Sequence, residues 1–467
     1  MSIVYLGVGQ CGTQLLSSFL TQNLNDRRAS SYLLDDTNQF RGLLVDAEPK
    51  PINRILENSC LKLHLRRNNL LCGRTGCGSN WAFGYFGHVE QGRLNKEAVE
   101  AVRRECEKLD YCIGLCLVHS LAGGTGSGLG LRLVEDAVEE LDLCLRLTFS
   151  VTPHRYGDAP LQSYNSLLTL GRLTQLCESV VLLQNDWLLT QLNCRLPRNW
   201  AASSRPPTDP SAMAQMGITV DEMNRLAADQ MMNLLAPCDE LARDGDSVQA
   251  DGVRSVHAEP LALNHSLTAL SEARFIRVIS ERARSLNSEK SSCTDWDHMQ
   301  HLLPTKLRCC PIDATWNLEK PGQRTGCRPL GTLTALLVYR GRLTGLTNPR
   351  TRDSDDGRTK ERERTGRPTS SSLQRLHDYM RPVRWNPSPF DHWYESRPTA
   401  VENSVTLAFN SCCITEDLNC LLYRAQIRRN AKAYLHWYEK FGCTQDTFDA
   451  AVEQLRDVVR GYEDLAR

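Results

Sequence analysis

Short apolar runs alternate with stretches of helical spacing from residue 1 to about residue 185 of the chain. The runs IVYLGV, RGLLVDAE, IGLCLVHSL, LCLRLTFSVT and SVVLLQND have the length and apolar content of buried strands. Between them, NKEAVEAVRRECEKLD and LGLRLVEDAVEELD repeat apolar residues every three or four positions. This alternation predicts an α/β fold whose N-terminal domain is a Rossmann-like parallel sheet with helices on both faces.

The pattern changes after residue 196. A loop rich in Pro, Ser and Ala at 197–216 precedes VDEMNRLAADQMMNLLA, which has the spacing of a helix, and the polar stretch 239–258 predicts a flexible insertion. TLTALLVYRGRL is the clearest strand of a second α/β region. Near the C-terminus, FDAAVEQLRDVV puts Phe448, Val452, Leu455 and Val459 on one helical face, which predicts a helix lying against the body.

These changes divide the chain into four predicted parts. They are an N-terminal domain at 1–196, a loop and central helix at 197–238, an intermediate α/β domain at 239–384 and a C-terminal helical domain at 385–467. Within the third part, residues 347–371 are almost purely charged residues, Pro, Gly, Ser and Thr, which cannot bury a core. We expect a disordered surface loop there; its six arginines leave a basic recognition tail as the alternative.

Composition narrows the class of protein. The 467 residues include 55 basic and 55 acidic side chains, and this neutral balance argues against a nucleic-acid partner held by the overall field. MSIVYLGVGQ lacks the features of a secretory signal, and no run is long enough to span a membrane, so a cytosolic protein without a membrane partner is expected. The 19 cysteines predict reduced core thiols, with a metal site at Cys72 and Cys77 as the weaker alternative.

Two glycine-rich stretches follow strands and open helices. GVGQCG at 7–12 has the G-x-G-x-x-G form of a dinucleotide-binding turn, but no acidic residue ends a second strand about 20 positions later. AGGTGSGLG at 122–130 carries five glycines and no lysine, so it is not a P-loop. Bare backbone at a helix N-terminus can surround anionic oxygens, and Thr125 and Ser127 add hydroxyl donors.

A pair of carboxylates supports a phosphate site that uses a metal. Asp46 and Glu48 end the strand LLVDAEP, and the alternation of a strand points both to the same side. Mg²⁺ commonly takes one or two carboxylates together with phosphate oxygens. With no lysine in either glycine stretch, a triphosphate would require such neutralisation.

An ordered series of motifs resembles the tubulin superfamily. The series is GQCGTQ at 9–14, VDAEP at 45–49, GSNWAFGY at 78–85, AGGTGSG at 122–128, SYNSLLTL at 163–170, QNDWLL at 184–189 and AKAYLHWYEKFG at 431–442. The resemblance covers nearly the whole chain and implies a tubulin-like fold that binds GTP or GDP with Mg²⁺. Within the family, VDAEPKPIN, CGSNWAFGY and QSYNSLLTL resemble the δ branch more than α, β or γ, with an ε-like or other divergent member as the alternative.

The resemblance also implies roles for individual positions. Asp46 and Glu48 would act through Mg²⁺ and water, and the nucleotide would be held by Gln10, Cys11, Gln14, Cys77, Gly78, Ser79, Asn80, Ser120, Ala122, Gly123, Gly124, Thr125, Gly126, Asp158, Gln162, Asn185 and Asn224. In this set, Cys77, Gly78 and Ser79 would approach the γ-phosphate, Asp158 and Gln162 the ribose, and Asn185 and Asn224 the guanine edges.

Several positions depart from the family pattern. Ser79 replaces an asparagine, Gln162 replaces a glutamate, and Val220 stands where an aromatic ring usually stacks on guanine. In tubulin polymers the next subunit supplies an acid that positions the hydrolytic water. The matching segment here, 261–271, contains no carboxylate, although Glu259 and Glu272 flank it. No catalytic residue is therefore assigned, and GTP hydrolysis is left open.

Three functions compete on these grounds. The resemblance favours a GTP-binding structural protein that adds to the microtubules of centrioles, basal bodies and cilia or flagella, with α-, β- or ε-tubulin or microtubule ends as partners. The alternatives are a nucleotide-free interaction module of the same fold and, from GVGQCG alone, an NAD(P)-dependent oxidoreductase. DWDHMQH at 295–301 and HWY at 436–438 are interpreted as a solvated helix segment and as helix packing, not as sites.

Overall fold

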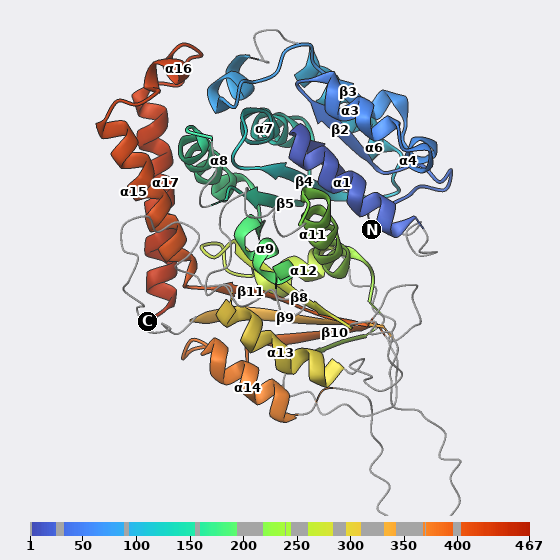
Figure 1. The fold of residues 1–467 in the computed structure, drawn as a ribbon, viewed down its shortest axis with the longest axis vertical. Helices are drawn as coiled ribbons and strands as arrows, with labels where there is room; N and C mark the ends of the chain where they lie inside the picture. Colours follow the sequence, from blue (N-terminus) through green and yellow to red (C-terminus); the bar gives the residue numbers. More distant parts are fainter. Residues whose placement is uncertain are drawn as a thin grey trace, which may run out of the picture.

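One sheet runs through the whole molecule. The computed structural model describes residues 2–24, 32–87, 93–154, 159–193, 218–238, 240–243, 260–283, 296–309, 331–341, 368, 370–395 and 403–467. Within these residues an 11-stranded sheet has the order β3-β2-β1-β4-β5-β6-β8-β11-β9-β10-β7 (Figure 1). The strands are β1 Ser2–Val8, β2 Gly42–Asp46, β3 Leu70–Cys72, β4 Cys112–Ser120, β5 Leu145–Thr152, β6 Ser179–Gln184, β7 Glu240–Arg243, β8 Phe275–Arg282, β9 Thr332–Arg340, β10 Phe390–Glu395 and β11 Ser404–Ser411.

Helices cover both faces of this sheet and connect its strands (Figure 1). They are α1 Gly9–Asn23, α3 Pro49–Leu56, α4 Ser59–His64, α6 Leu94–Glu107, α7 Gly130–Glu140, α8 Gln162–Leu176, α9 Asn185–Asn193, α11 Val220–Leu235, α12 Pro260–Leu267, α13 Trp296–Cys309, α14 Ser370–Met380, α15 Ile414–Asn430, α16 Leu435–Glu439 and α17 Gln445–Leu465. Single turns η1 Arg67–Asn69, η2 Phe83–Gly87 and η3 Thr125–Leu129 complete the set.

The N-terminal strands confirm the α/β prediction. Strands β3, β2, β1, β4, β5 and β6 all pair in parallel. Alternate residues of β1 enter two separate cores: Ile3 and Tyr5 pack with α1 and α11, whereas Val4, Leu6 and Val8 pack with α6, α7 and α8. Burial on both faces explains why these strands are continuous apolar runs in the sequence.

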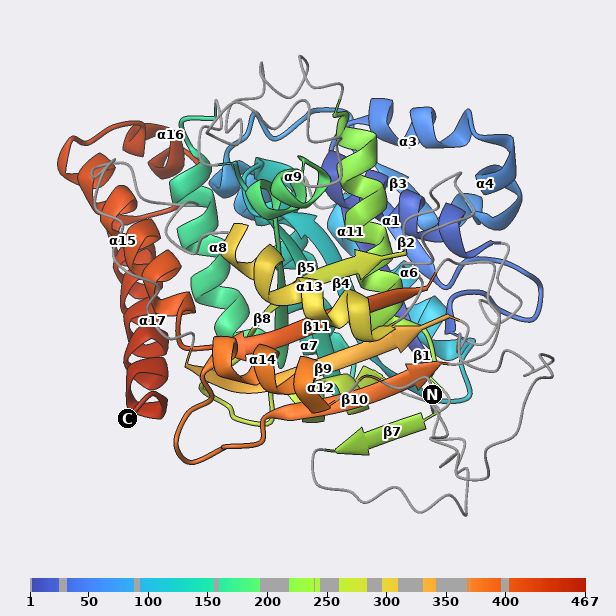
Figure 2. The ribbon, with the colours of Figure 1, turned by 60° about the horizontal axis from the view of Figure 1, so that its bottom comes forward.

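The second half of the sheet contains strands that the sequence pattern did not predict. Besides the predicted β9, it holds β8, which pairs in parallel with β6, and β11, which lies antiparallel between β8 and β9 (Figure 2). Strand β7 falls within the polar stretch 239–258, and β10 and β11 fall within 385–467, so neither range consists only of insertion or helix. Helices α13 and α14 pack on the outer face of this half.

Helix α11 is the central helix. Thr219 caps it with a capping box, in which its hydroxyl accepts from the Glu222 N–H and the Glu222 carboxylate accepts from the Thr219 N–H. At the other end the buried Arg340 guanidinium of β9 donates to the carbonyls of Asn233 and Pro237. The capping box thus closes the N-terminus of the helix, and Arg340 attaches its C-terminal end to β9.

The C-terminal helices α15 and α17 run beside α8 (Figure 1). The predicted face of α17 is confirmed, because Phe448, Val452, Leu455 and Val459 are all buried in the core that α8 shares. The contact with α8 is close: a Cβ added at Gly171 would lie 3.1 Å from the Cα of Ala451.

Some predictions fall outside the described residues. These are the loop at 197–216, Asp158, Glu259 and all of the charged segment 347–371 except residues 368, 370 and 371. Where the helices are described, none combines the length and hydrophobicity that crossing a bilayer requires.

Candidate nucleotide-binding site

The carboxyl ends of the parallel strands meet at one edge of the sheet. The chain leaves β1 toward β2 on one side, and β4 pairs on the other side of β1, so the topology reverses between β1 and β4. Ligands of open α/β sheets bind in the crevice at such a point. The two glycine stretches of the sequence follow these two strands directly.

The two glycine loops pack against each other. Gly9 has φ +73°, and a Cβ added there would lie 2.9 Å from the backbone N of Gly126 and 3.4 Å from the Cβ of Thr125. Gly12 is equally constrained, because its Cβ would lie 2.1 Å from the carbonyl oxygen of Val118. These glycines are needed for the close approach of backbone to backbone, and the two glycine stretches therefore lie side by side at this edge of the sheet.

A third turn, residues 77–80, closes on the second glycine loop. A Cβ added at Gly124 would lie 2.5 Å from the backbone N of Asn80. The Thr125 hydroxyl hydrogen-bonds the Cys77 thiol, whose pKa burial raises to about 11. Sequence motifs separated by more than a hundred residues thus form one continuous backbone surface.

Two glycines of these loops face open space instead of backbone. A Cβ added at Gly78 or Gly123 would meet nothing within 4 Å among the described atoms. Gly78 and Ser79 both have positive φ, at 53° and 56°, which is an unusual conformation for a serine. Both residues are exposed, and successive backbone N–H groups of such a turn can bind anions.

The Asp46 side chain fits a cation site. It is only 3% exposed, its Oδ1 accepts from the Glu48 N–H at 3.1 Å, and its Oδ2 has no hydrogen-bond partner among the described residues. Burial raises the pKa of Asp46 to about 6. Glu48 is exposed beside it, with Oε1 so close to Gly76 that a Cβ there would lie 1.9 Å away. An orphaned buried carboxylate oxygen beside phosphate-type loops matches the ligands that Mg²⁺ prefers.

Two polar residues that the sequence did not single out hold the loops in place. The Nδ1–H of His119 donates to the Gly126 carbonyl at 2.9 Å, and its Nε2 accepts from the Ser150 hydroxyl at 2.7 Å. Burial lowers the pKa of His119 to about 4, so the ring is neutral at pH 7. No motif signals this role, because a buried histidine inside a strand resembles any core residue.

Asn165 of α8 is the second. Its Nδ2 donates to the carbonyls of Ser79 at 2.8 Å and Ala122 at 2.7 Å. Its Oδ1 accepts from the Trp81 N–H at 3.1 Å and the Tyr438 hydroxyl at 2.6 Å. Asn165 lies inside the motif SYNSLLTL, which carries part of the family resemblance, but nothing in the sequence indicates the role of this residue.

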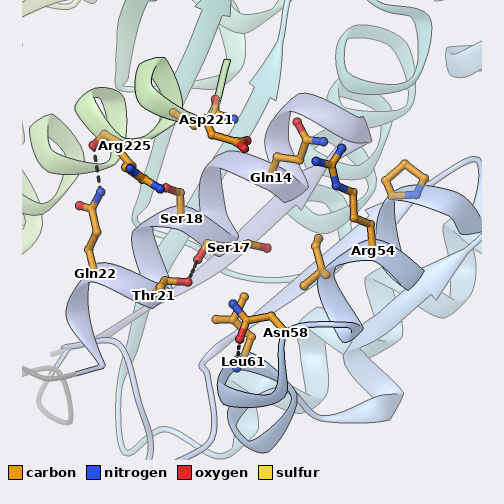
Figure 3. Close-up of a pocket in the computed structure, with 13 residues that line it drawn as sticks. Gln14, Ser17, Ser18, Thr21, Gln22, Arg54, Asn58, Leu61, Asp221 and Arg225 are labelled. Carbon is orange, nitrogen blue, oxygen red and sulfur yellow. Dashed lines mark hydrogen bonds between the residues drawn. The ribbon is translucent and has the colours of Figure 1, made fainter. Parts of the chain in front are cut away.

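A cavity of about 330 Å³ lies between α1, α3, α4 and α11 (Figure 3). Two members of the predicted set, Gln14 of α1 and Asn224 of α11, line it together with Arg54 and Arg225. Figure 3 shows the α1 side chains facing α11 on one side and α3 and α4 on the other. Gln14 and Asn224 thus border the same cavity, and their assignment to the guanine base stays a prediction.

The remaining predicted residues are spread around the same edge. Gln10 is exposed at the start of α1, and Cys11 is half-buried with a pKa raised by burial to about 12. Ser120 ends β4 and accepts from the Ala122 N–H, Asn185 directly follows β6, and Gln162 is buried in the first turn of α8. Val220 is 61% exposed at the first turn of α11, and the roles of all these residues stay predictions.

The segment 261–271 offers no acid in the structure. Asn264 of α12 accepts from the Ser179 and Thr268 hydroxyls, and His265 is exposed on the same helix. The flanking Glu272 is exposed, but its Cβ lies against Gly461 of α17.

The burial of side chains tests three other interpretations of the sequence, those of DWDHMQH, of HWY and of Cys72 with Cys77. DWDHMQH is partly solvated, with His298 exposed, but Trp296, Met299 and Gln300 are buried, so the solvated interpretation was only partly right. In HWY, Tyr438 packs in the core as expected, whereas Trp437 is 47% exposed. Cys72 is exposed and Cys77 is buried, and the described residues contain no group of three metal-binding side chains.

Comparison with known proteins agrees with this geometry. Residues 2–193 match the model of the Tubulin/FtsZ family, GTPase domain. The full chain is 24% identical to the tubulin delta chain of Macaca fascicularis over 497 residues and to that of Homo sapiens over 494 residues. It is also 24% identical to the tubulin delta chain of Mus musculus over 510 residues, and each alignment covers 100% of both chains.

The chain therefore contains, at residues 2–193, a GTPase domain of the Tubulin/FtsZ family, a class for which the family implies binding of GTP or GDP and association with other tubulins. Within that class, it is similar over its full length to tubulin delta chains.

Proposed function

We propose that this chain is a guanine-nucleotide-binding structural tubulin of the δ type, acting in microtubule-based assemblies. The observation that carries the proposal is the contact between the two glycine loops, where Gly9 meets Gly126 at the topological switch point of the sheet. Turn 77–80 adds a third backbone surface, so a triphosphate would be enclosed on three sides. The cavity at Gln14 and Asn224 would receive the base.

Asp46 and Glu48 would hold Mg²⁺, directly or through water. The unpartnered Oδ2 of Asp46 and its raised pKa support this, because a cation would remove the cost of burying that charge. The metal would neutralise charge on the phosphates, a task for which neither glycine loop supplies a lysine.

The chain would bind GTP without activating hydrolysis in a neighbour. Segment 261–271 has no carboxylate, Asn264 is engaged with Ser179 and Thr268, and Glu272 lies beside Gly461. Its own nucleotide could still be cleaved by the acid of an α- or β-type neighbour. The nucleotide would then act by changing the stability of subunit contacts, not by turnover.

In the cell, we propose a role in the microtubules of centrioles and basal bodies and in cilium or flagellum assembly, with α-, β- or ε-tubulin or microtubule ends as partners. Similarity to tubulin delta chains supports this assignment. Localisation of a tagged full-length protein tests it: diffuse signal, with no concentration at centrioles or basal bodies, contradicts the proposal.

The biochemical test is nucleotide extraction and binding. Nucleotide released from the purified protein should be GTP or GDP, and Thr125→Ala and Asp46→Ala should each weaken Mg·GTP binding by about tenfold or more. Asp464→Ala, which alters a 69% exposed carboxylate on α17, is the matched control and should bind normally. Recovery of NAD(P) would instead support an oxidoreductase.

A nucleotide-free interaction module is the second candidate, and one observation favours it. Val220 leaves the base side without an aromatic ring, and its side chain is 61% exposed. Loss of stacking would weaken base binding by about 1–3 kcal/mol. Protein that contains no nucleotide and binds none at millimolar GTP would support this candidate.

A further inference from the structure

The side chain of Asn165 hydrogen-bonds three segments of the chain: residues 79–81, the second glycine loop and α16. Both of its donors and both of its acceptor positions are used, by Ser79, Ala122, Trp81 and Tyr438, and the residue is completely buried. An asparagine has no further hydrogen-bonding capacity than this. Any shift of one segment must therefore break a bond at Asn165 or be passed to the other segments.

Two further contacts tie the turn at 77–80 and the η2 turn that follows it to α16 and the residues just after α16. The Asn80 Nδ2 donates to the carbonyl of Trp437 at 2.9 Å. The Phe83 and Phe441 rings pack with their centroids 4.6 Å apart. Together with the Asn165–Tyr438 bond, these contacts join α16, and Phe441 just beyond its C-terminus, to the turn and to the residues that follow it.

The backbone of the turn has a conformation that a bound ligand could change. Gly78 and Ser79 adopt positive φ and are both exposed, and a Cβ added at Gly78 would meet nothing within 4 Å among the described atoms. For Ser79 this conformation costs about 1–3 kcal/mol and persists only while its surroundings hold it, whereas glycine adopts it freely. A ligand that binds the backbone of this turn would change the balance between its conformations.

Two aromatic side chains lie at the surface here, one directly before α16 and one within it. Tyr434 and Trp437 are 40% and 47% exposed, and their ring centroids are 5.9 Å apart. Large aromatic side chains are costly to leave in water and are frequent at the centres of protein interfaces. Nothing in the described residues covers this pair.

We propose that Asn165 is a positioning residue that couples turn 77–80 to helix α16, so that the presence of a γ-phosphate changes the exposed aromatic pair Tyr434–Trp437. This rests on the proposed function, because the turn can respond only if a guanine nucleotide binds there. The chemical groups that carry the response are the Tyr438 hydroxyl, the Asn165 carboxamide and the backbone of the turn.

Hydrogen–deuterium exchange of full-length protein tests the coupling. Binding of GDP and of a non-hydrolysable GTP analogue is measured first, and then exchange of peptides that cover 431–442 in both states. The wild-type peptide should exchange about threefold or more slowly with the analogue than with GDP. Tyr438→Phe should bind both nucleotides within about threefold of wild type, because it removes one hydrogen bond remote from the ligand. The nucleotide-dependent difference at 431–442 should disappear in this variant.

Tyr434→Phe is the matched control, because it removes an exposed hydroxyl from the same segment and should keep the difference. A second variant, Asn165→Asp, keeps both acceptors but removes both donors, and it should lose affinity for the analogue more than for GDP. Failure of the wild type to bind either nucleotide overturns the proposed function itself. Normal binding with no difference at 431–442, or a difference that survives Tyr438→Phe, overturns the coupling alone.

Discussion

At the scale of single residues, three positions decide whether the proposed site can bind a nucleotide. Gly9 has no room for a Cβ, whereas Gly123 has room that a ligand would fill. Asp46 keeps one carboxylate oxygen buried without a partner. Gly9 is thus required by the packing of the protein itself, whereas Gly123 and Asp46 leave a space and an oxygen for a ligand, and each residue gives a distinct prediction.

Asp46→Asn should stabilise the nucleotide-free protein while weakening Mg·GTP binding. Burial raises the pKa of Asp46 from 3.8 to about 6, so the folded state holds the proton more tightly than the unfolded state. The stability due to that proton is complete below about pH 4 and is lost as pH rises to about 6. Above pH 6 the asparagine variant should therefore be more stable by about 1–3 kcal/mol. Urea unfolding in the absence of metal and nucleotide, at pH 4.5 and pH 7.5, measures this; a variant less stable than wild type at the higher pH contradicts it.

Gly123→Ala and Gly9→Ala should separate binding from folding. The added methyl at Gly123 meets no described atom, so stability should change by less than about 0.5 kcal/mol while nucleotide affinity falls about tenfold. Gly9→Ala forces alanine into φ +73° against the Gly126 backbone, so the melting temperature itself should fall. Thermal melts and titration with GTP distinguish the two. Wild-type affinity in Gly123→Ala would show that the phosphates lie elsewhere.

At the scale of elements, burial decides which parts of the chain could be predicted. Strands β1, β2, β4, β5, β6 and β9 are continuous apolar runs and were found from the sequence. Strand β8, FIRVISER, was missed because it carries Arg277 and Glu281 into the core, where they pair with Asp417 and Lys306. The partners lie far away in the sequence, so local periodicity cannot reveal that those charges are buried. The glycine loops could be predicted because a cluster of glycines after a strand indicates close backbone approach. The roles of Asn165 and His119 could not, because they depend on hydrogen bonds to other segments of the chain.

Helix α17 offers a test of packing that is independent of nucleotide. Leu455 is fully buried between α17 and α8, so Leu455→Ala should lower the free energy of unfolding by about 2–4 kcal/mol. Asp457→Ala, two positions along on the exposed face, should change it by less than about 0.5 kcal/mol. Denaturant titration followed by circular dichroism measures both; equal effects would mean that this face of α17 is not packed.

At the scale of the whole molecule, the proposed domains are joined by one sheet. Strand β8 pairs with β6 through Val180–Leu182, and α11 contributes to the core beneath both halves. The proposed boundaries at 196, 238 and 384 therefore separate parts that share hydrogen bonds and side-chain packing. Unfolding either half exposes the edge of the other.

We expect thermal unfolding to give a single calorimetric transition, whose midpoint temperature rises as a whole when nucleotide is added. A ligand at 100 times its dissociation constant stabilises the native state by about 2.7 kcal/mol, and the shared sheet should distribute this to the second half. Differential scanning calorimetry with and without Mg·GTP, combined with exchange protection of β9, measures it. Two transitions of which only one moves would show that the halves unfold independently.

The bond from Asn80 to Trp437 spans 357 positions of the chain, and this separation sets an order of events during synthesis. A ribosome adding about 5–20 residues per second takes some tens of seconds to make the second partner after the first. Throughout that time the nascent N-terminal sheet can form, but the Asn80 carboxamide lacks its acceptor. The turn can therefore gain its full set of contacts only after nearly the whole polypeptide has been made, and a premature stop before codon 437 would leave the Asn80 carboxamide without this acceptor even though every glycine of both loops had been translated.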